Sequence, residues 1–348
     1  SMLVRSAEDA LNFKLVTDLG YYSEVLDYLK KEKLALAENE KIKFVRYTDL
    51  NDKAINEESM VSGKSKIVVI YGTGSIEDGK SDQNSIGSYT FSEEIRKARL
   101  DEDVKAIVLR INSPGGSALA SDVIWKEVEL TKKVKPVVAS MSDMAASGGY
   151  YIAMACDTII AHPTTITGSI GVFGVLMNGK EFLEDKLGVT ADRVTTGKFS
   201  DIGSFTRPIT EFEKQIIQKE VERIYDQFTL KAAQGRQISV ETMRDELAEG
   251  RVWSGIEAKN NKLVDGFGNL DDAIAIAAEM ANQKEYQVVY WPEQKTTFLT
   301  QLIRQMEEEE SKAIKLNLGS LYPVYKTIQN ADKLNGVQAR IPYELIIR

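Results

Sequence analysis

Ser142-Asp143-Met144-Ala145-Ala146-Ser147-Gly148-Gly149-Tyr150-Tyr151 joins a strand-like run at residues 136–140 to a helical run of small residues at 150–155. Ser147 is therefore predicted at the point where a strand passes into a helix. Its small neighbours let a substrate backbone come close. A helix that begins here directs its unpaired N–H groups and positive dipole end at whatever Ser147 attacks. This setting suits a nucleophilic hydroxyl, and the alternative is a tight packing site between helix and sheet.

A glycine turn follows another predicted strand. The apolar run at residues 104–111 leads into Asn112-Ser113-Pro114-Gly115-Gly116-Ser117. A Pro-Gly-Gly turn after a strand can direct backbone N–H groups into a cavity, and an oxyanion hole needs donors fixed before the reaction begins. The two motifs together predict an acyl-transfer site, although either one alone would also fit an ordinary strand–helix turn.

The order of apolar and amphipathic segments predicts the fold class. Apolar runs alternate with helical patterns, which is typical of an α/β fold with a mostly parallel sheet covered by helices. Thr90-Phe91-Ser92-Glu93 is predicted to cap the first helix of the alternation, and residues 72–88 read as a loop. The expected strands are 66–71, 104–111, 136–140, 157–161 and 286–291, and the expected helices are 90–100, 118–132, 211–233, 239–249 and 270–281.

Composition narrows the class of protein further. The chain has 348 residues and a net charge of −8, which argues against nucleic acid as a partner. Its single cysteine, Cys156, excludes an internal disulfide and is predicted to be buried. No apolar run approaches the roughly 18 residues that a membrane span requires. We predict no metal and no other cofactor.

Three motifs in one order carry a resemblance to a known family. Asn112-Ser113-Pro114-Gly115-Gly116-Ser117, Met144-Ala145-Ala146-Ser147-Gly148-Gly149-Tyr150-Tyr151 and Thr167-Gly168-Ser169-Ile170-Gly171-Val172-Phe173-Gly174 resemble the signal peptide peptidase A family. These are the protease IV serine peptidases, which have a Clp-protease/crotonase-like fold, and the resemblance covers about residues 64–281. It implies that Ser147 is the nucleophile and that its general base is a lysine.

The resemblance also implies roles for the neighbours of Ser147. Gly116 and Gly148 would donate backbone N–H groups to the oxyanion, and Ser169 would hydrogen-bond the base. For Ser169 the alternative is a turn serine that caps its own backbone. An extended peptide would pair with the flanking strands. The residues expected to bind this substrate are Ser113, Gly115 and Gly171.

The general base is the component that this sequence lacks. The only histidine, His162, follows a strand and precedes a proline, so we predict it in a surface turn and exclude an ordinary Ser-His-Asp triad. In short members of the family the lysine lies in a segment that matches residues 196–204, where Ser200 takes its place. Lys198 is a weak substitute, because an exposed lysine has a pKa of about 10.4.

Long members of the family offer an explanation for the missing lysine. In them the N-terminal domain supplies the lysine and the C-terminal domain supplies the serine, so this chain resembles the C-terminal half. We expect residues 1–63 to connect from a missing N-terminal domain, 64–283 to form the peptidase domain and 284–348 to form a C-terminal extension. The resemblance further implies a homo-oligomer at the bacterial inner membrane, with the peptidase domain facing the periplasm.

Three functional hypotheses follow from these observations. The first is a serine endopeptidase of the Ser/Lys dyad type that degrades cleaved signal peptides and other short or unfolded peptides. The second is a crotonase-type enzyme acting on acyl-coenzyme A, which shares the fold and the oxyanion hole but has no need for Ser147. The third is a non-catalytic scaffold domain, because the chain by itself lacks the base. Labelling of Ser147 by a serine-reactive probe would separate the first from the second.

Overall fold

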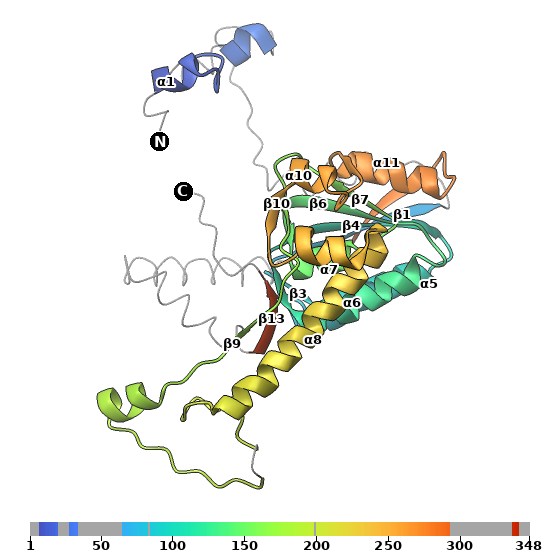
Figure 1. The fold of residues 1–348 in the computed structure, drawn as a ribbon. Helices are drawn as coiled ribbons and strands as arrows, with labels where there is room; N and C mark the ends of the chain where they lie inside the picture. The colour runs from blue at the N-terminus through green and yellow to red at the C-terminus, as the bar shows by residue number, and fades with distance from the viewer. Residues whose placement is uncertain are drawn as a thin grey trace, which may run out of the picture. The chain divides into compact units, whose positions relative to one another are not determined.

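The computed structural model describes residues 7–19, 28–33, 65–82, 84–197, 200–292 and 336–340. The chain divides into two units, Ser1–Met60 and Val61–Arg348. The described elements of the first unit are the helix α1 (Ala7–Asn12) and the π-helical turn η1 (Leu29–Lys33). The second unit contains all the motifs of the sequence analysis, and its elements are shown in Figure 1.

A mostly parallel sheet forms the centre of the second unit. It runs in the order β10-β8-β6-β4-β1-β12, and β7 pairs with β6 and with β11. Every pairing is parallel except that of β8 with β10. The strands are β1 (Lys66–Thr73), β4 (Val104–Ser113), β6 (Val137–Ala146), β7 (Thr158–Ala161), β8 (Ile166–Gly168), β10 (Val252–Ser254), β11 (Gly266–Phe267) and β12 (Gln287–Trp291). The edge strand β12 lies in the stretch expected to be a C-terminal extension.

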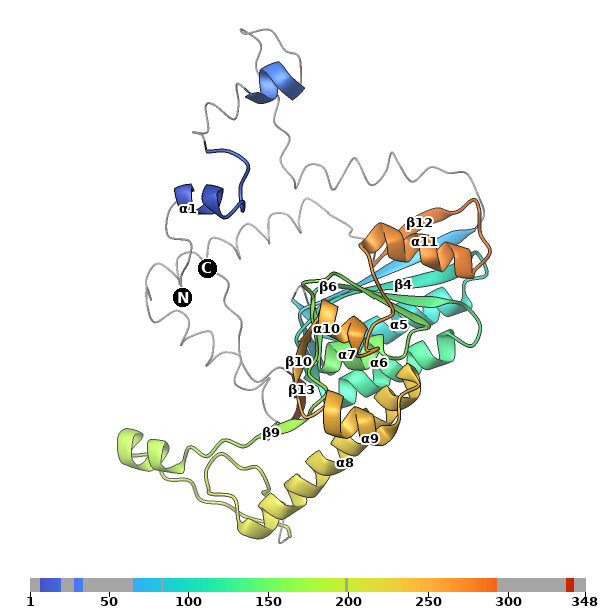
Figure 2. The same cartoon turned by 45° about the horizontal axis from the view of Figure 1, so that its top comes forward.

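Helices cover both faces of this sheet, as Figures 1 and 2 show. Val68 and Ile70 of β1 belong to one core, whereas Ile67 and Val69 belong to the other. Because successive side chains of a strand point to opposite faces, a strand covered on both faces is apolar throughout. The first core packs against α5 (Ser88–Leu100), α6 (Ala118–Thr131) and α7 (Gly148–Ala153), and the second packs against α11 (Leu270–Met280). The predicted α/β fold is confirmed.

A second, smaller sheet lies beside the end of the first and was not predicted. Its order is β3-β2-β5-β13-β9. Two of its strands fall within residues 72–88, which we had interpreted as a loop, and one comes from the C-terminal stretch. Its strands are β2 (Ser75–Glu77), β3 (Ser85–Gly87), β5 (Gly115–Ser117), β9 (Phe173–Val175) and β13 (Gly336–Arg340).

The prediction that Thr90-Phe91-Ser92-Glu93 caps α5 is wrong, whereas two later helices begin at capping sequences. α5 begins at Ser88, and its N-cap Gly87 has no side-chain cap. The hydroxyl of Thr90 instead accepts a hydrogen bond from the N–H of Ser81 at 3.0 Å, because the preceding loop folds back over the helix. By contrast, α8 (Glu211–Arg236) and α10 (Gly255–Asn260) begin with complete capping boxes. The helix expected at 239–249 is α9 (Val240–Thr242) followed by the π-helical turn η3 (Met243–Leu247).

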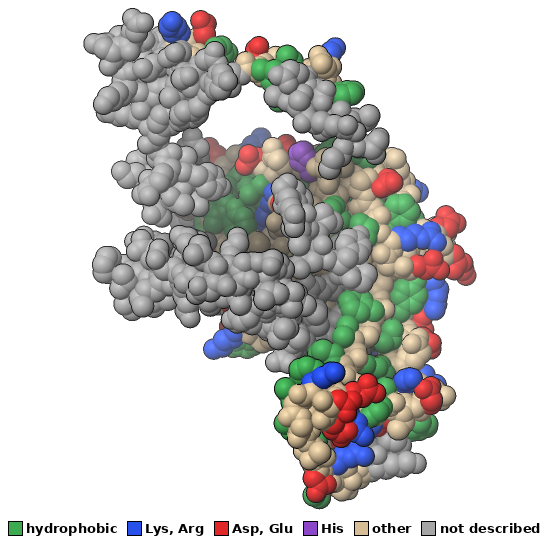
Figure 3. All heavy atoms as spheres, turned by 90° about the vertical axis from the view of Figure 1, so that its left-hand side faces the viewer, with side chains coloured by type: hydrophobic (Ala, Val, Ile, Leu, Met, Phe, Trp, Pro, Cys, Tyr) green, Lys and Arg blue, Asp and Glu red, His purple; other side chains and the backbone are tan. Residues whose placement is uncertain are grey.

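Residues 176–197 and 200–210, with the first turns of α8, form an arm that runs away from the two sheets (Figures 1 to 3). Where residues 200–210 lead into α8, the guanidinium of Arg207 binds the carboxylates of Asp201 and Glu213 at 2.8 and 2.5 Å. This contact lowers the pKa of Glu213 to about 2, so the pair stays ionised at neutral pH.

No described helix is both long enough and apolar enough to cross a membrane. Apolar side chains exposed on the described part of the arm are Leu176, Met177, Phe182, Leu187, Val189, Val194, Ile202, Phe205, Phe212 and Ile216.

Replacing Phe228 by Ala should destabilise the packing of α8 on α7. Phe228 is fully buried, and its ring centre lies 4.6 Å from that of Tyr151. Removing a buried aromatic side chain costs about 3–5 kcal/mol, so the free energy of unfolding from denaturant titration should fall by that amount. The control Leu230→Ala changes a side chain of the same helix that is 43% exposed. It should change the free energy by less than about 0.5 kcal/mol, and equal losses would contradict the packing described.

Candidate active site

Ser147 is the residue at which β6 ends and α7 begins. Its backbone has φ 52° and ψ −114°, a conformation that is costly for a residue with a Cβ atom. Two backbone hydrogen bonds hold it there. Its N–H donates to the carbonyl of Gly168 and its carbonyl accepts from the N–H of Tyr151, each at 2.8 Å. Strain that the surroundings enforce in this way is typical of functional positions.

The hydroxyl of Ser147 faces no basic group among the described residues. The side chain is fully buried. Its one hydrogen-bond partner within the described part of the chain is the carbonyl of Gly171, at 3.5 Å. That distance is at the limit of a hydrogen bond, and a carbonyl oxygen is too weak a base to remove a hydroxyl proton. The hydroxyl is therefore positioned, but it is not activated by what the structure describes.

A second serine leaves the sheet beside Ser147. β8 pairs with the end of β6 so that Gly168 lies opposite Ala146, and Ser169 and Ser147 are the next residues of the two strands. Ser169 also has a positive φ, 49°, and its N–H donates to the carbonyl of Arg251 at 2.7 Å. Its side chain is 2% exposed, and its hydroxyl has no hydrogen-bond partner among the described residues.

β5 brings the glycine turn to the same edge of the sheet. β4 pairs with β6 through Ser113 and Ala145, so the residues that follow them emerge next to each other. The buried hydroxyl of Ser113 accepts from the N–H of Gly115 at 3.1 Å, which fixes the turn. Gly115 has φ 100°, and a Cβ atom on Gly116 would lie 2.0 Å from the carbonyl oxygen of Ile76. Both positions therefore require glycine, the first for its conformation and the second for space.

The start of α7 packs directly against this turn. Gly148 is the first residue of α7, and it is buried. A Cβ atom on the next residue, Gly149, would lie 2.9 Å from the carbonyl oxygen of Ser113. Close approach of helix and turn thus depends on the absence of a side chain at Gly149. The structure brings together the predicted residues Ser147, Gly148, Ser169, Gly171, Ser113, Gly115 and Gly116.

Polar side chains that we did not single out from the sequence hold the strand ends in place. Asn112 accepts a hydrogen bond from the N–H of Met144 at 3.2 Å, and the hydroxyl of Thr167 donates to the carbonyl of Ala145 at 2.7 Å. Arg110 donates to the hydroxyl of Ser140 at 2.9 Å. Their signal in the sequence is a polar residue within or directly after an apolar strand, since a buried polar group needs a partner.

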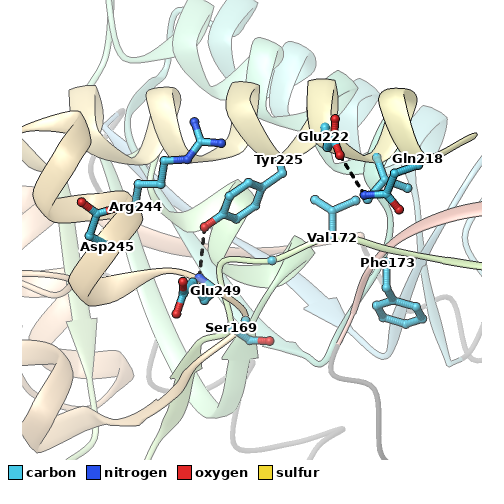
Figure 4. Close-up of a pocket in the computed structure, with 12 residues that line it drawn as sticks. Ser169, Val172, Phe173, Gln218, Glu222, Tyr225, Arg244, Asp245 and Glu249 are labelled. Atoms are coloured by element: carbon cyan, nitrogen blue, oxygen red, sulfur yellow. Dashed lines mark hydrogen bonds between the residues drawn. The ribbon is translucent and has the colours of Figure 1, made fainter. Parts of the chain in front are cut away.

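A pocket of about 520 Å³ opens beside Ser169 (Figure 4). Ser169 and Gly171 line it from the sheet side, and α8 lines it with Tyr225, whose hydroxyl accepts from the N–H of Glu249 at 3.2 Å. Of the described residues that line it, Arg244 alone is cationic, and it pairs with Asp226 at 2.8 Å. Arginine keeps its proton in proteins, so Arg244 cannot serve as a base.

The other residues considered for the base in the sequence analysis are Lys198 and His162, with Ser200 at the position expected for a lysine. Lys198 lies outside the described residues. Ser200 is exposed in a turn of the arm, where its hydroxyl donates to the carbonyl of Gly197 at 3.0 Å. His162 is exposed in the turn after β7, as predicted. The side chain of Cys156 is buried, also as predicted, and burial raises the pKa of its thiol.

Comparison with known proteins agrees with the geometry of the site. Residues 129–284 match the model of peptidase family S49. The chain is 39% identical to Protease 4 of Salmonella typhi over 84% of its length, and 38% identical to the chloroplastic serine protease SPPA of Arabidopsis thaliana over 77%. It is also 38% identical to a putative signal peptide peptidase SppA of Enterococcus faecium over 63%.

The chain spans only part of each of these relatives. It covers 46% of the Salmonella typhi protein, 40% of the Arabidopsis thaliana protein and 65% of the Enterococcus faecium protein. The match to the family model includes Ser147, Ser169 and Gly171, but it begins after the glycine turn of Gly115 and Gly116. The motifs, the fold and these identities lead to one conclusion, that the chain belongs to peptidase family S49, the family of protease 4 and signal peptide peptidase A.

Proposed function

We propose that this chain supplies the nucleophile of a serine peptidase of the Ser/Lys dyad type. The observation that carries the proposal is Ser147, a buried serine in a strained conformation at a strand–helix junction, beside a fixed glycine turn. An acyl-coenzyme A enzyme of crotonase type would not need this serine, and the family match also favours the peptidase. The base is proposed to be a lysine of an N-terminal domain of the same protein.

The pocket beside Ser169 is the proposed entry point of that lysine. Ser169 lines this pocket, and so does Gly171, whose carbonyl accepts from the Ser147 hydroxyl. The proposal requires that an amine placed there reach the hydroxyls of both Ser147 and Ser169. Burial lowers the pKa of a lysine toward neutrality, which turns it into a base. It would take the proton of Ser147 during attack and return it to the leaving amine.

The proposed substrate is an extended peptide. An extended chain can add to a strand by backbone hydrogen bonds alone. β5, which carries Gly116, pairs with β2 and β13, so a substrate would pair with β5 in place of β13. The N–H groups of Gly116 and Gly148 would then hold the oxyanion of the tetrahedral intermediate. This favours cleaved signal peptides and other short or unfolded peptides over folded proteins. We further propose, by analogy with the family that it resembles, that this activity lies at the bacterial inner membrane, facing the periplasm.

The arm supports a further proposal, that the chain forms a homo-oligomer. Its apolar side chains protrude into solvent, and Val194 is 97% exposed. Figure 3 shows hydrophobic side chains between charged ones on the surface of the arm. Many exposed large apolar side chains on one element favour a site of protein–protein interaction. A neighbouring subunit would cover this surface and bring its own domains close to the pocket beside Ser169.

The isolated chain should be a weak peptidase or none. Without a base the Ser147 hydroxyl stays protonated, and general-base assistance is worth about 10²–10⁴-fold in rate. Adding the N-terminal half should restore turnover of small peptide esters or amides. Ser147→Ala should then abolish turnover, while Lys198→Ala should change it little. If the isolated chain cleaves peptides well and Lys198→Ala stops it, Lys198 is the base and the split dyad is wrong.

Gly116→Ala should lower turnover in the complemented enzyme by about 10²–10³-fold, the usual effect of losing an oxyanion donor. The new Cβ atom would meet the backbone of Ile76, so β5 must move. Gly255→Ala is the matched control, because its Cβ atom would also lie 2.0 Å from a carbonyl oxygen, that of His162, away from the site. It should lower the melting temperature similarly but leave turnover nearly unchanged. Equal turnover in the two variants would remove Gly116 from the mechanism.

Light scattering should show particles larger than a monomer. Val194→Asp places a charge on the exposed apolar surface of the arm and should shift the distribution toward monomer. Leu119→Asp, at a 67% exposed position of α6, is the control and should leave the distribution unchanged. A chain that stays monomeric at high concentration would count against assembly through the arm.

A further inference from the structure

Three helices each carry one part of the candidate site. α6 begins two residues after Gly116, and α7 begins directly after Ser147. α8 lines the pocket beside Ser169 with Tyr225. Figures 1 and 2 show the three helices together on one side of the larger sheet. The placement of these helices relative to one another therefore sets the positions of the glycine turn, the nucleophile and the pocket.

The side chain of Asp122, on α6, is the point at which the three helices meet. Its carboxylate oxygen Oδ1 accepts a hydrogen bond from the Tyr151 hydroxyl of α7 at 2.7 Å. The ammonium of Lys231, on α8, pairs with the same oxygen. That ammonium also lies over the ring of Trp125 of α6, with 3.7 Å from Nζ to the ring centre. Hydrogen bonds to an ionised group are roughly twice as strong as neutral ones, so one carboxylate joins all three helices firmly.

Tyr151 connects this contact to the nucleophile. Its N–H donates to the carbonyl of Ser147 at 2.8 Å. Its ring is buried, and the centre of the ring lies 4.6 Å from that of Phe228 on α8. Burial and the bond to Asp122 raise the pKa of the Tyr151 hydroxyl, which therefore keeps its proton and remains a donor. The residue that holds the strained backbone of Ser147 is thus itself held by Asp122.

We propose that Asp122 is a positioning residue that fixes Ser147 relative to Gly116 and the pocket by holding Tyr151 and Lys231. This proposal rests on the proposed peptidase function and adds a residue outside the site on which the geometry of the site depends. Asp122 acts through Tyr151 and takes no part in the reaction itself. An oxyanion donor works only if it is placed before the reaction begins, and a misplacement of about 1 Å is enough to lower a rate by about 10²-fold.

Turnover of a small peptide ester by the chain complemented with the N-terminal half gives the first test. Tyr151→Phe removes only a hydroxyl, and Asp122→Ala truncates a side chain that is 44% exposed, so both variants should fold. In each of them kcat should fall by about 10–100-fold. KM should stay unchanged, because the interactions that are lost are made only in the transition state. An unchanged kcat, or a rise in KM without a fall in kcat, would overturn the proposal.

Two further variants separate positioning from a general loss of stability. Asparagine keeps an acceptor for the Tyr151 hydroxyl, so Asp122→Asn should recover most of the kcat that Asp122→Ala loses. The double variant, Asp122→Ala with Tyr151→Phe, should be no slower than the slower single variant, because both changes remove the same hydrogen bond. Losses that multiply in the double variant would show that the two residues act independently and would overturn the proposal.

Tyr150→Phe is the matched control on the same helix. It removes a buried hydroxyl that donates to the carbonyl of Leu263 at 2.9 Å, a contact that involves neither α6 nor α8. The melting temperature should therefore fall in this variant, while kcat stays nearly unchanged. A loss of kcat equal to that of Tyr151→Phe would mean that any weakening of α7 slows the enzyme, and would remove the special role of Asp122.

Amide exchange in the chain alone separates this proposal from the proposed function. The Tyr151 amide should exchange about tenfold faster in Asp122→Ala than in the unchanged chain, and equal exchange would overturn the positioning role. Faster exchange, without any Ser147-dependent turnover by the complemented enzyme, would refute the peptidase function and leave the positioning role standing. Ser147-dependent turnover with the same kcat in every variant would refute the positioning role and leave the peptidase standing.

Discussion

The pairing of the last residues of β6 with β8 is the contact on which the candidate site depends. It places Ser147 and Ser169 side by side, and it continues in the hydrogen bond from the Ser147 N–H to Gly168. Without that bond the positive φ of Ser147 would relax toward an ordinary strand or helix conformation, since nothing else in its covalent structure favours it. The hydroxyl of Thr167 links the same two strands, because it donates a hydrogen bond to the carbonyl of Ala145. The site is therefore a property of the sheet edge rather than of any single loop.

The parts of the fold that the sequence predicts are those with long, regular patterns. Strands of the larger sheet are buried on both faces, so they appear as continuous apolar runs such as residues 104–111. Long helices with polar caps, such as α8 and α11, are predicted from the sequence equally well. The smaller sheet was missed because β2, β3, β5 and β9 have three residues each, too few for a period to show. The cap of α5 was misassigned because tertiary contacts use the Thr90 hydroxyl elsewhere.

The candidate site also has parts that the sequence predicts and parts that it does not. Ser147, Gly116 and Ser169 stand at junctions that the sequence marks with small residues and turn residues. The side chains that hold those junctions, Asn112 and Thr167, are distant in sequence from the atoms they bind, and no local pattern predicts such partners. The general base is a different case. The sequence shows Ser200 where a lysine is expected. Under our proposal the lysine comes from a part of the protein outside this chain, which no pattern in this sequence could predict.

One kinetic experiment addresses the claim that Ser147 is a nucleophile completed by a lysine from outside the described chain. The rate at which a fluorophosphonate probe labels Ser147 is measured against pH, with and without the N-terminal half. The rate depends on the deprotonated base, so it rises with pH through the pKa of that base. Our account predicts slow labelling of the chain alone. With the N-terminal half we expect an increase of about 10²–10⁴-fold, with a midpoint near neutral pH. Equally fast labelling of the chain alone, with the same midpoint, would contradict it, because the base would then lie within this chain.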